Sequence, residues 1–177
     1  MNAYDPRREE NYQEYLRLLK DSNYHKVTFD EESGGVSAIH NKHKFDSDIG
    51  SYGIKIGEYE KRAVEVLRKR GHCIILESEI AANNVKTPDG TIDGRVMDIK
   101  ATDKQGVWAI KTKLHNAAKQ GAECVILYFH KKELFSNERM DDGWNRFLND
   151  CDSQKYVDTI KQVICVVEDT VIEWDIK

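Results

Sequence analysis

The sequence predicts an α/β domain in which a central mixed sheet is flanked by helices. Two segments, 58–70 and 107–120, carry apolar residues with helical periodicity. Each is followed by a continuous apolar run, 72–77 and 123–129, which is typical of a strand buried on both faces. An Asp-Gly pair at 93–94 lies between them and indicates a tight β-hairpin. Strands that alternate with helices in this order give a sheet with helices on its faces.

Length and composition are those of one domain, or of one domain with a small extension. The chain has 177 residues, of which 40% are hydrophobic and 33% are charged, enough to fill a core and cover a water-exposed surface. No apolar run approaches the roughly 18 residues of a membrane span, and no signal peptide is visible, so no membrane partner is expected. The net charge of −4 argues mildly against a protein that coats nucleic acid, but it is compatible with a local basic face.

The four cysteines show no CxxC spacing. Three of them, Cys73, Cys124 and Cys165, lie in apolar runs that are typical of strands. We therefore expect buried free thiols at these positions rather than a disulfide or a zinc site.

Residues 1–50 are predicted to form a helix and strand extension that packs on the rest of the chain. Asp5-Pro6 is typical of a helix start, and an apolar stripe at helical spacing follows it: Tyr12, Tyr15, Leu16 and Leu19. Segments 24–29 and 36–39 are predicted to be a strand and its returning partner. The basic run 40–44 is interpreted as a solvated loop, in which His40 and His43 do not hold a metal. Segment 47–57 is a linker or a functional loop.

Segment 58–70 is the clearest helix, with Ala63, Val64 and Leu67 as its buried stripe. Glu60 lies three, four and seven residues before these positions and is therefore on the side that faces the core. An unpaired carboxylate is costly there. From the residues alone, Glu60 could be ion-paired, could interact with the helix dipole near the N-terminus, or could reach a metal.

The central prediction concerns the hairpin around Asp93-Gly94. A type I′ turn at this pair sets a register in which Asp89 is opposite Asp98. Directly opposed residues share one face of the sheet, with Cβ atoms about 4.5–5.5 Å apart. Because side chains alternate along a strand, Lys100 joins Asp98 on that face and Ile99 points the other way.

Two carboxylates at this distance repel each other unless a positive charge lies between them. Mg²⁺ binds in proteins through one or two carboxylates together with water and substrate phosphates. The hairpin therefore predicts a metal site for phosphodiester chemistry. The alternative is a structural one, in which Asp89 is an exposed turn residue and Asp98 pairs with Lys100 or Arg95.

Segment 107–120 is the second strong helix, and its core stripe is predicted to comprise Val107, Ile110, Leu114, Ala117 and Ala118. Lys113 and Gln120 are seven residues apart and share one flank, whereas Lys111 and His115 are assigned to a solvated flank. With the strands on either side, this helix forms a βαβ unit, whose parallel crossover is right-handed. Earlier in the chain, Asn83-Asn84 is interpreted as a turn.

The C-terminal third is predicted to pack back on this unit. Trp144, Phe147 and Leu148 indicate a short helix, and 156–160 a further helical turn. Segments 163–167 and 171–174 are predicted to form a final hairpin. The chain ends in a second Asp-x-Lys triplet, at 175–177, with no Pro-Asp partner and no following helix. The triplet alone therefore has little specificity.

The hairpin and its surroundings resemble a known nuclease family. Pro88-Asp89, eight residues and then Asp98-Ile99-Lys100 are similar to the PD-(D/E)xK signature of metal-dependent nucleases. The wider segment 57–129 resembles the C-terminal tRNA nuclease domain of contact-dependent growth inhibition (CdiA-type) toxins. The further matching positions are Glu60, Ala63, Leu67, Gly71, Thr87, Ile110, Leu114, Ala118, Gln120 and the strand 125–127. Asp98 stands where related toxins more often have Glu.

The resemblance implies a restriction-endonuclease-like core over residues 51–177. It also implies that Asp89, Asp98, the Ile99 carbonyl and Glu60 hold Mg²⁺ or Mn²⁺, and that Asp89, Asp98, Lys100 and Glu60 are catalytic. Lys113 and Gln120 would then contact substrate. The expected partners are a nucleic acid, preferably tRNA, and an immunity protein; the expected site of action is the cytoplasm, after delivery as part of a secreted toxin. Two alternatives remain, a DNA endonuclease on the same site and an inactive toxin-like interaction domain of a mobile element.

Overall fold

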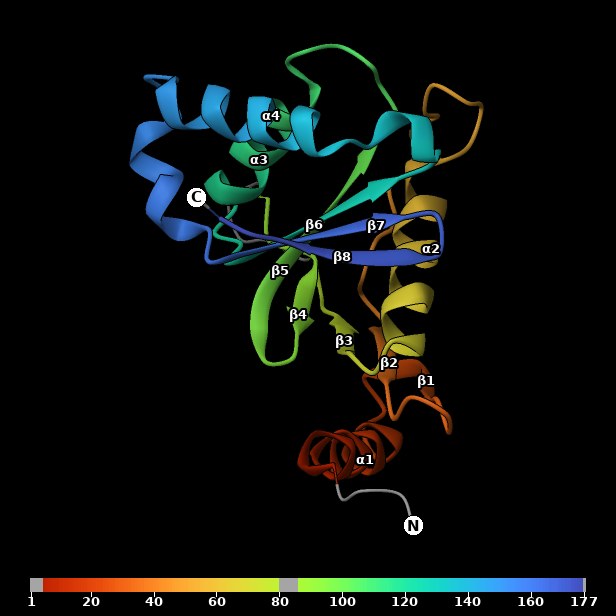
Figure 1. Cartoon of the computed structure of the whole chain (residues 1–177). Coiled ribbons are helices and arrows are strands. Elements are labelled where there is room, and N and C mark those ends of the chain that lie inside the picture. The colour runs from red at the N-terminus through yellow and green to blue at the C-terminus, as the bar shows by residue number, and fades with distance from the viewer. Residues whose placement is uncertain (1–4, 80–85, 177) are drawn as a thin grey trace.

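A computed structural model describes residues 5–79 and 86–176 of the chain. One eight-stranded sheet runs through the molecule, and its strands lie side by side in chain order from β1 to β8 (Figure 1). The strands are β1 (Tyr24–Phe29), β2 (Val36–His40), β3 (Cys73–Leu76), β4 (Gly90–Ile92), β5 (Arg95–Thr102), β6 (Cys124–Phe129), β7 (Gln162–Val167) and β8 (Thr170–Trp174). The helices are α1 (Pro6–Leu19), α2 (Ile56–Lys69), α3 (Ala109–Lys119) and α4 (Asn137–Asn149), with short 3₁₀ turns η2 (Lys132–Leu134) and η3 (Gln154–Thr159).

The sheet is mixed, which confirms the prediction of an α/β fold with a central mixed sheet flanked by helices. The parallel pairs are β2 with β3, β5 with β6, and β6 with β7, and the other neighbours are antiparallel. Helices α2, α3 and α4 lie in the three parallel connections in that order. The predicted βαβ unit around α3 is therefore present.

The helices cover both faces of the sheet. On one face, α2 packs through Tyr59, Ala63 and Leu67 against alternate residues of β3 to β7, such as Ile74 and Ile99. On the other face, the core contains α3, α4 and the intervening strand residues, such as Val125 and Leu127. Figure 1 shows α3 and α4 together at one end of the molecule and α1 at the other. The predicted buried stripe of α2 is confirmed.

Helix α1 packs beside β1 and β2, and the predicted stripe on it is only partly right, because Tyr15 packs against this core whereas Leu19 does not. Leu19 is 52% exposed, whereas its neighbour Leu18 is fully buried among Val36, Ala38 and other residues of the sheet. The buried line of the helix also contains a polar residue, Asn11, whose amide donates to the carbonyl oxygens of Gly34 and Gly71. A hydrophobic periodicity does not reveal a buried face that includes an asparagine.

The first 50 residues contribute α1, β1 and β2. Since β2 pairs with β3, these strands continue the same sheet. Whether a domain boundary lies at residue 50 stays a prediction.

The central hairpin has the predicted geometry. Asp93 and Gly94 both have positive φ, 50° and 82°, as a type I′ turn requires. The register pairs Ile92 with Arg95, and Gly90 with Met97. Gly90 is needed for the close approach of β3, because a Cβ atom there would lie 1.9 Å from the carbonyl oxygen of Ile75.

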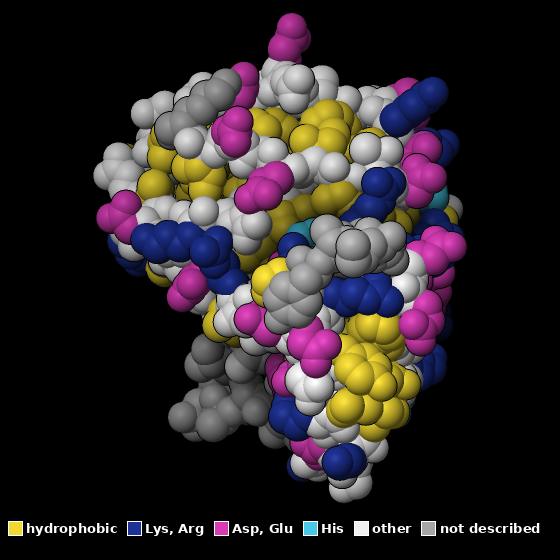
Figure 2. Space-filling view, turned by 60° about the horizontal axis from the view of Figure 1, so that its bottom comes forward, with side chains coloured by type: hydrophobic (Ala, Val, Ile, Leu, Met, Phe, Trp, Pro, Cys, Tyr) yellow, Lys and Arg dark blue, Asp and Glu magenta, His cyan; other side chains and the backbone are white. Residues whose placement is uncertain are grey.

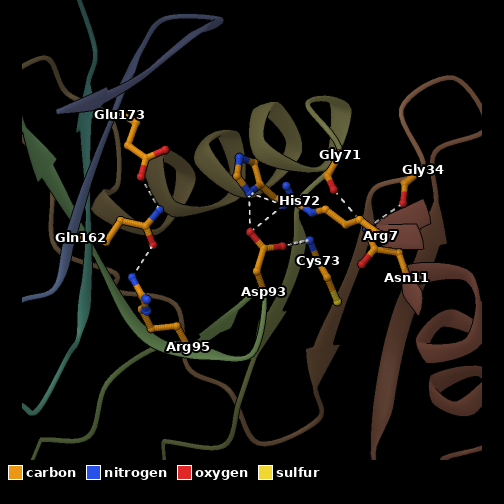
Figure 3. A network of polar contacts seen from close by, with 10 residues as sticks. All are labelled: Arg7, Asn11, Gly34, Gly71, His72, Cys73, Asp93, Arg95, Gln162 and Glu173. Atoms are coloured by element: carbon orange, nitrogen blue, oxygen red, sulfur yellow. Dashed lines mark hydrogen bonds and ion pairs between the residues drawn. The ribbon is translucent and has the colours of Figure 1, made fainter. Parts of the chain in front are cut away.

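The hairpin turn is held by a polar network that joins it to α1 and β3 (Figure 3). One oxygen of the Asp93 carboxylate accepts from the Cys73 backbone N–H at 2.9 Å. The other lies 2.6 Å from Arg7 Nη2 and 2.7 Å from His72 Nδ1. Asp93 thus serves both as a turn residue and as the anchor of the N-terminal helix.

Replacing Asp93 by Ala is expected to lower the free energy of unfolding by about 2 kcal/mol, because it removes charge-assisted hydrogen bonds and a residue that tolerates positive φ. Asp93→Asn keeps the turn preference but loses the charge, and about half of that effect is expected. Urea unfolding of the wild type, Asp93→Ala and Asp93→Asn measures the loss of stability in each variant. Equal stability of Asp93→Ala and the wild type would show that the network does not anchor α1.

Two details of α3 differ from the prediction. Val107 precedes the helix and is 58% exposed, so it is not part of the core stripe, whereas Ile110, Leu114, Ala117 and Ala118 are buried. The flank with Lys111 and His115 is not solvated. Lys111 Nζ lies 3.2 Å from Asp150 Oδ2, and His115 Nδ1 lies 2.8 Å from Ser153 Oγ, because the segment after α4 packs over this flank.

The C-terminal elements agree with the prediction. Trp144 and Phe147 of α4 are buried, segment 154–159 is a 3₁₀ turn, and β7 and β8 form the final antiparallel pair. Cys73, Cys124 and Cys165 are buried free thiols, as expected. The predicted turn at Asn83-Asn84 lies outside the described residues.

Candidate metal and phosphate pocket

The sheet opens at the N-terminal end of β4, and the candidate site lies in this opening. Strand β4 pairs only with the first residues of β5, so residues 98–102 keep β6 as their strand partner in the described part of the chain. Asp89 precedes β4, and its Oδ2 accepts from the Ile99 backbone N–H at 2.7 Å. The side chain thereby satisfies a backbone donor on a stretch of β5 that pairs, among the described strands, with β6 alone, and it brings Asp89 beside Asp98.

Lys100 and Gln120 complete this side of the site. Lys100 Nζ lies 2.7 Å from Asp98 Oδ2. The surrounding donors and acceptors orient the Gln120 amide so that its nitrogen donates to Asp98 Oδ2 at 3.0 Å and its oxygen accepts from Lys100 Nζ at 3.3 Å. Helix α3 therefore contributes a side chain that contacts both the acid and the base of the Asp-x-Lys triplet.

Glu60 approaches from α2, near the N-terminal end of that helix. It is 7% exposed, and its Oε2 has no hydrogen-bond partner among the described residues. Lys113 of α3 lines the same pocket as Glu60. The structure thus brings together all the predicted site residues, around a pocket of about 860 Å³: Glu60, Asp89, Asp98, Ile99, Lys100, Lys113 and Gln120.

Burial perturbs the ionisation of the acids in this pocket. Burial and the neighbouring Asp89 raise the pKa of Asp98 to about 8, and burial and the nearby Glu60 raise the pKa of Asp89 to about 7. Burial also raises the pKa of Glu60. The pKa of Lys113 is lowered by burial and by the positive charge of Lys100. Clustered acids that resist ionisation are a common feature of functional sites.

The purely structural interpretation of the hairpin requires an exposed Asp89 and an Asp98 that pairs with Lys100 or Arg95, and the first requirement is not met. Asp89 is not an exposed turn residue, since it is 7% exposed. Asp98 does pair with Lys100, as that interpretation requires. However, a single ammonium group offsets only one of the two buried carboxylates.

Contrary to the sequence prediction, His43 is not part of a solvated loop. Its side chain is fully buried, and it lies 3.7 Å from Glu60 Oε2 through Nε2. The ring packs edge-on against Phe45 with 4.8 Å between centroids, and Nδ1 lies 2.8 Å from the Glu77 carbonyl oxygen. No local pattern indicates this burial, because the polar partners of His43, Glu60 and Glu77, lie 17 and 34 residues further along the chain.

Two further acids, Glu79 and Asp103, also line the pocket and were not predicted. Asp103 is buried, and its Oδ2 accepts from the Ser51 backbone N–H at 2.6 Å. This bond fixes the segment after β2 along the rim of the pocket, which residues 47–51 line. The glycine-rich segment is therefore a pocket loop rather than a linker.

The donors in this pocket fit a divalent cation. Carboxylate oxygens are the ligands preferred by Mg²⁺ and Mn²⁺, and Asp89, Asp98 and Glu60 supply them from three separate segments. Glu60 Oε2 has no hydrogen-bond partner among the described residues, and the ammonium group of Lys100 lies beside two buried carboxylates, those of Asp98 and Asp89. In a strand, the N–H and C=O groups of one residue point to the same side, so the Ile99 carbonyl lies on the Asp89 side as well.

Fold and pocket together define a mixed α/β domain with an acid- and lysine-lined cleft where its sheet opens. Residues 86–172, just under half of the chain, match the family model for the contact-dependent growth inhibition CdiA C-terminal domain. Over this range the chain resembles the C-terminal toxin domains of CdiA-type proteins, which is the resemblance that its sequence predicts. No curated protein and no solved structure gave a match.

The matched range includes most of the predicted site residues of the pocket. It contains the predicted site residues from Asp89 to Gln120, whereas Glu60 and His43 lie before it. It also extends beyond the predicted segment 57–129 to the final hairpin. Among the helices that the structure describes, none combines the length and the apolar character needed to cross a bilayer.

Proposed function

We propose that the chain is a toxic effector domain that acts as a metal-dependent nuclease of the PD-(D/E)xK type, with RNA, and tRNA in particular, as its substrate. One observation carries this proposal: Asp89, Asp98 and Lys100 meet in one pocket at the opening of the sheet. The resemblance to CdiA-type toxin domains over residues 86–172 supports a toxic role. A restriction-endonuclease-like core is consistent with a mixed sheet between α2 and α3.

Asp89, Asp98, the Ile99 carbonyl and Glu60 would hold Mg²⁺ or Mn²⁺. When bound, the cation would supply a Lewis acid for the scissile phosphate and acidify a water molecule. Lys100, whose Nζ lies 2.7 Å from Asp98 Oδ2, would orient the attacking water and offset the charge that develops on the phosphate oxygens. Attack by water on phosphorus would break the bond to the 3′ oxygen and leave 5′-phosphate and 3′-hydroxyl ends.

The lysines of the pocket are the expected contacts for the rest of the substrate. Besides Lys100, the lining contains Lys44, Lys86, Lys104 and Lys113. On the face in Figure 2, positive and negative side chains are interspersed rather than collected in one basic surface. Recognition of a polyanion is therefore expected to depend on the pocket and its rim.

Incubation of the purified chain with total tRNA and with duplex DNA, with Mg²⁺ and with EDTA, tests the proposal. Cleavage of tRNA that needs Mg²⁺ and leaves 5′-phosphate ends is expected. Cleavage of DNA alone would favour the DNA endonuclease. Activity that survives both EDTA and Lys100→Met would sink the mechanism.

An inactive interaction domain with the same fold is the remaining candidate. Titration with Mn²⁺ separates it from a nuclease, because a vestigial site would bind no metal. In that case Asp89→Ala would leave the thermal midpoint unchanged or raised in the presence of metal.

Substitution of Lys113 or Gln120 is expected to weaken substrate use more mildly than loss of a metal ligand. Lys113→Met should raise KM for tRNA about tenfold or less, because it removes one phosphate contact. Gln120→Ala should lower kcat about tenfold, because Lys100 and Asp98 lose a shared partner. Lys119→Met is the matched control, since Lys119 is exposed on the same helix and outside the pocket. If Lys113→Met and Gln120→Ala both had wild-type kinetics, α3 would not contribute to substrate binding.

The toxin resemblance also gives an expectation about partners and delivery. CdiA C-terminal toxin domains typically pair with immunity proteins. We expect a small immunity protein that blocks this pocket, and action in the cytoplasm of a target cell after delivery by a secreted toxin. Toxicity on expression in the cytoplasm, relieved by Asp98→Asn, checks the site of action.

A further inference from the structure

A second group of metal-ligand atoms lies beside Asp89. His43, Glu79 and Asp89 each offer one ligand atom, and these three atoms lie within 4.8 Å of one another. His43 follows the end of β2 and Glu79 follows the end of β3. Because β2 and β3 are parallel, their carboxyl ends meet at the same edge of the sheet, next to the hairpin that carries Asp89.

The hydrogen bonding of His43 determines which ring nitrogen is free. Nδ1 lies 2.8 Å from the carbonyl oxygen of Glu77, and a carbonyl oxygen only accepts, so Nδ1 carries the proton. In the neutral ring, Nε2 then presents its lone pair. A metal-binding histidine typically donates its other N–H to a backbone carbonyl or a carboxylate in this way.

The free nitrogen faces an equally unsatisfied oxygen. Nε2 of His43 and Oε2 of Glu60 lie 3.7 Å apart, too far for a hydrogen bond, and both are buried without a hydrogen-bond partner among the described residues. The two side chains are 0% and 9% exposed. When the ring of His43 is neutral, two lone pairs face each other here, and a cation between them would satisfy both.

We propose that His43, Glu79 and Asp89, with Glu60 3.7 Å from His43 Nε2, form a second cation position that takes a transition metal such as Zn²⁺. Imidazole favours such an ion, whereas Mg²⁺ and Mn²⁺ prefer a set of oxygen ligands such as that of Asp89 and Asp98. The two positions share Asp89. The pocket thereby becomes a centre with one all-oxygen position and one position that contains nitrogen. The proposal concerns binding and does not require that the chain cleaves nucleic acid.

Calorimetric titration of the whole chain with Zn²⁺, in millimolar Mg²⁺ to occupy the all-oxygen position, tests this proposal. The wild type is expected to bind one Zn²⁺, and His43→Gln to bind it roughly a hundredfold more weakly. His25→Gln is the matched control, because His25 is exposed on β1, and it should bind as the wild type does. Equal Zn²⁺ affinity of His43→Gln and the wild type would overturn the proposal.

A second measurement on the wild type removes any dependence on how the variant folds. In a sample labelled with ¹⁵N-histidine, Zn²⁺ should shift the Nε2 resonance of His43 and leave that of His25 in place. If the His43 resonance does not move at saturating Zn²⁺, the proposal is overturned. That result would mean that His43 and Glu60 form a simple ion pair that Zn²⁺ does not displace. A chain that binds Zn²⁺ through His43 but cleaves neither tRNA nor DNA would uphold the second cation position and refute only the nuclease function.

Discussion

Asp98→Asn is expected to lower Mg²⁺-dependent cleavage by roughly a hundredfold to a thousandfold, the range seen when one preorganised charge contact to a transition state is lost. The substitution keeps the shape of the side chain. It removes the charge that lies 2.7 Å from Lys100 and that would bind the cation. Gel-based cleavage rates at saturating tRNA measure the effect.

Although Asp98→Asn is expected to lower activity, it is expected to raise the stability of the metal-free protein. Asp98 is 1% exposed and is close to Asp89, so its charge is costly without a cation. The metal-free variant should therefore be more stable than the metal-free wild type at pH 8, and Mg²⁺ should stabilise it less. A residue that trades stability for activity in this way is typical of a functional site.

Asp175→Asn is the matched control, since it alters the acid of the other Asp-x-Lys triplet, which is exposed near the end of the chain. It should change neither activity nor stability. Full activity of Asp98→Asn, or equal damage from both substitutions, would contradict the assignment of the site.

Metal-free protein is expected to lose stability as pH rises from about 5 to about 8, by roughly 2 kcal/mol or more, at about 1.4 kcal/mol for each unit of pKa shift that is expressed. The pKa of Asp98 is about 8 and that of Asp89 about 7 in the folded chain, against 3.8 for the free side chain. Between these values the unfolded chain has released its protons and the folded chain still holds them. Each rise in pH in this window therefore favours the unfolded state.

His43 acts with the same sign. Burial lowers its pKa, but the nearby Glu60 carboxylate and the Glu77 carbonyl oxygen outweigh this and raise it from 6.5. The stabilisation from a charged His43 is present below the unfolded pKa and is lost as pH rises through the folded one. His43 thus reinforces the effect of the two aspartates, whereas His130 opposes it, because burial and the nearby Arg62 lower the pKa of His130 below 6.5.

Mg²⁺ should remove most of this slope, because a cation replaces the protons on Asp89 and Asp98. The stabilisation by Mg²⁺ should accordingly be small near pH 5 and large near pH 8. Urea unfolding across this range, with Mg²⁺ and with EDTA, measures both curves, and Asp98→Asn should flatten the metal-free curve. A metal-free chain that becomes more stable between pH 5 and pH 8 would refute the account of the buried acids.

The hairpin shows which features of the site can be predicted from residues that are close together in the sequence. A type I′ turn needs positive φ at two positions, and Asp93-Gly94 meets that need by its own conformational preferences. The turn sets the register, and the register brings Asp89 to Asp98 and places Lys100 on the same face. Helix periods likewise predict the buried stripe of α2 and the flank of α3 that carries Lys113 and Gln120. These features depend on residues that are neighbours in the chain.

Other features depend on which segments the sheet brings together. Leu18 rather than Leu19 is buried because Asn11, a polar residue, finds two backbone acceptors in distant loops. His43 is buried because β2 and β3 run parallel, so that their following loops converge on Glu60. Nothing near His43 in the chain signals this, since its polar partners, Glu60 and Glu77, are 17 or more residues away.

By itself, therefore, the amino-acid sequence determined the alternation of helices and strands, the turn at Asp93-Gly94 and the meeting of two acids and a lysine, because backbone preferences and side-chain periodicity act over a few residues. Only the folded sheet decided that β4 stops short, that Asp89 accepts from the backbone of β5, and that His43, Glu60 and Glu79 converge on this opening. Burial, and with it the cost of each charge, depends on atoms from every layer of the molecule. That is why the acids could be located from the sequence, but their raised pKa values and the histidine beside them could not.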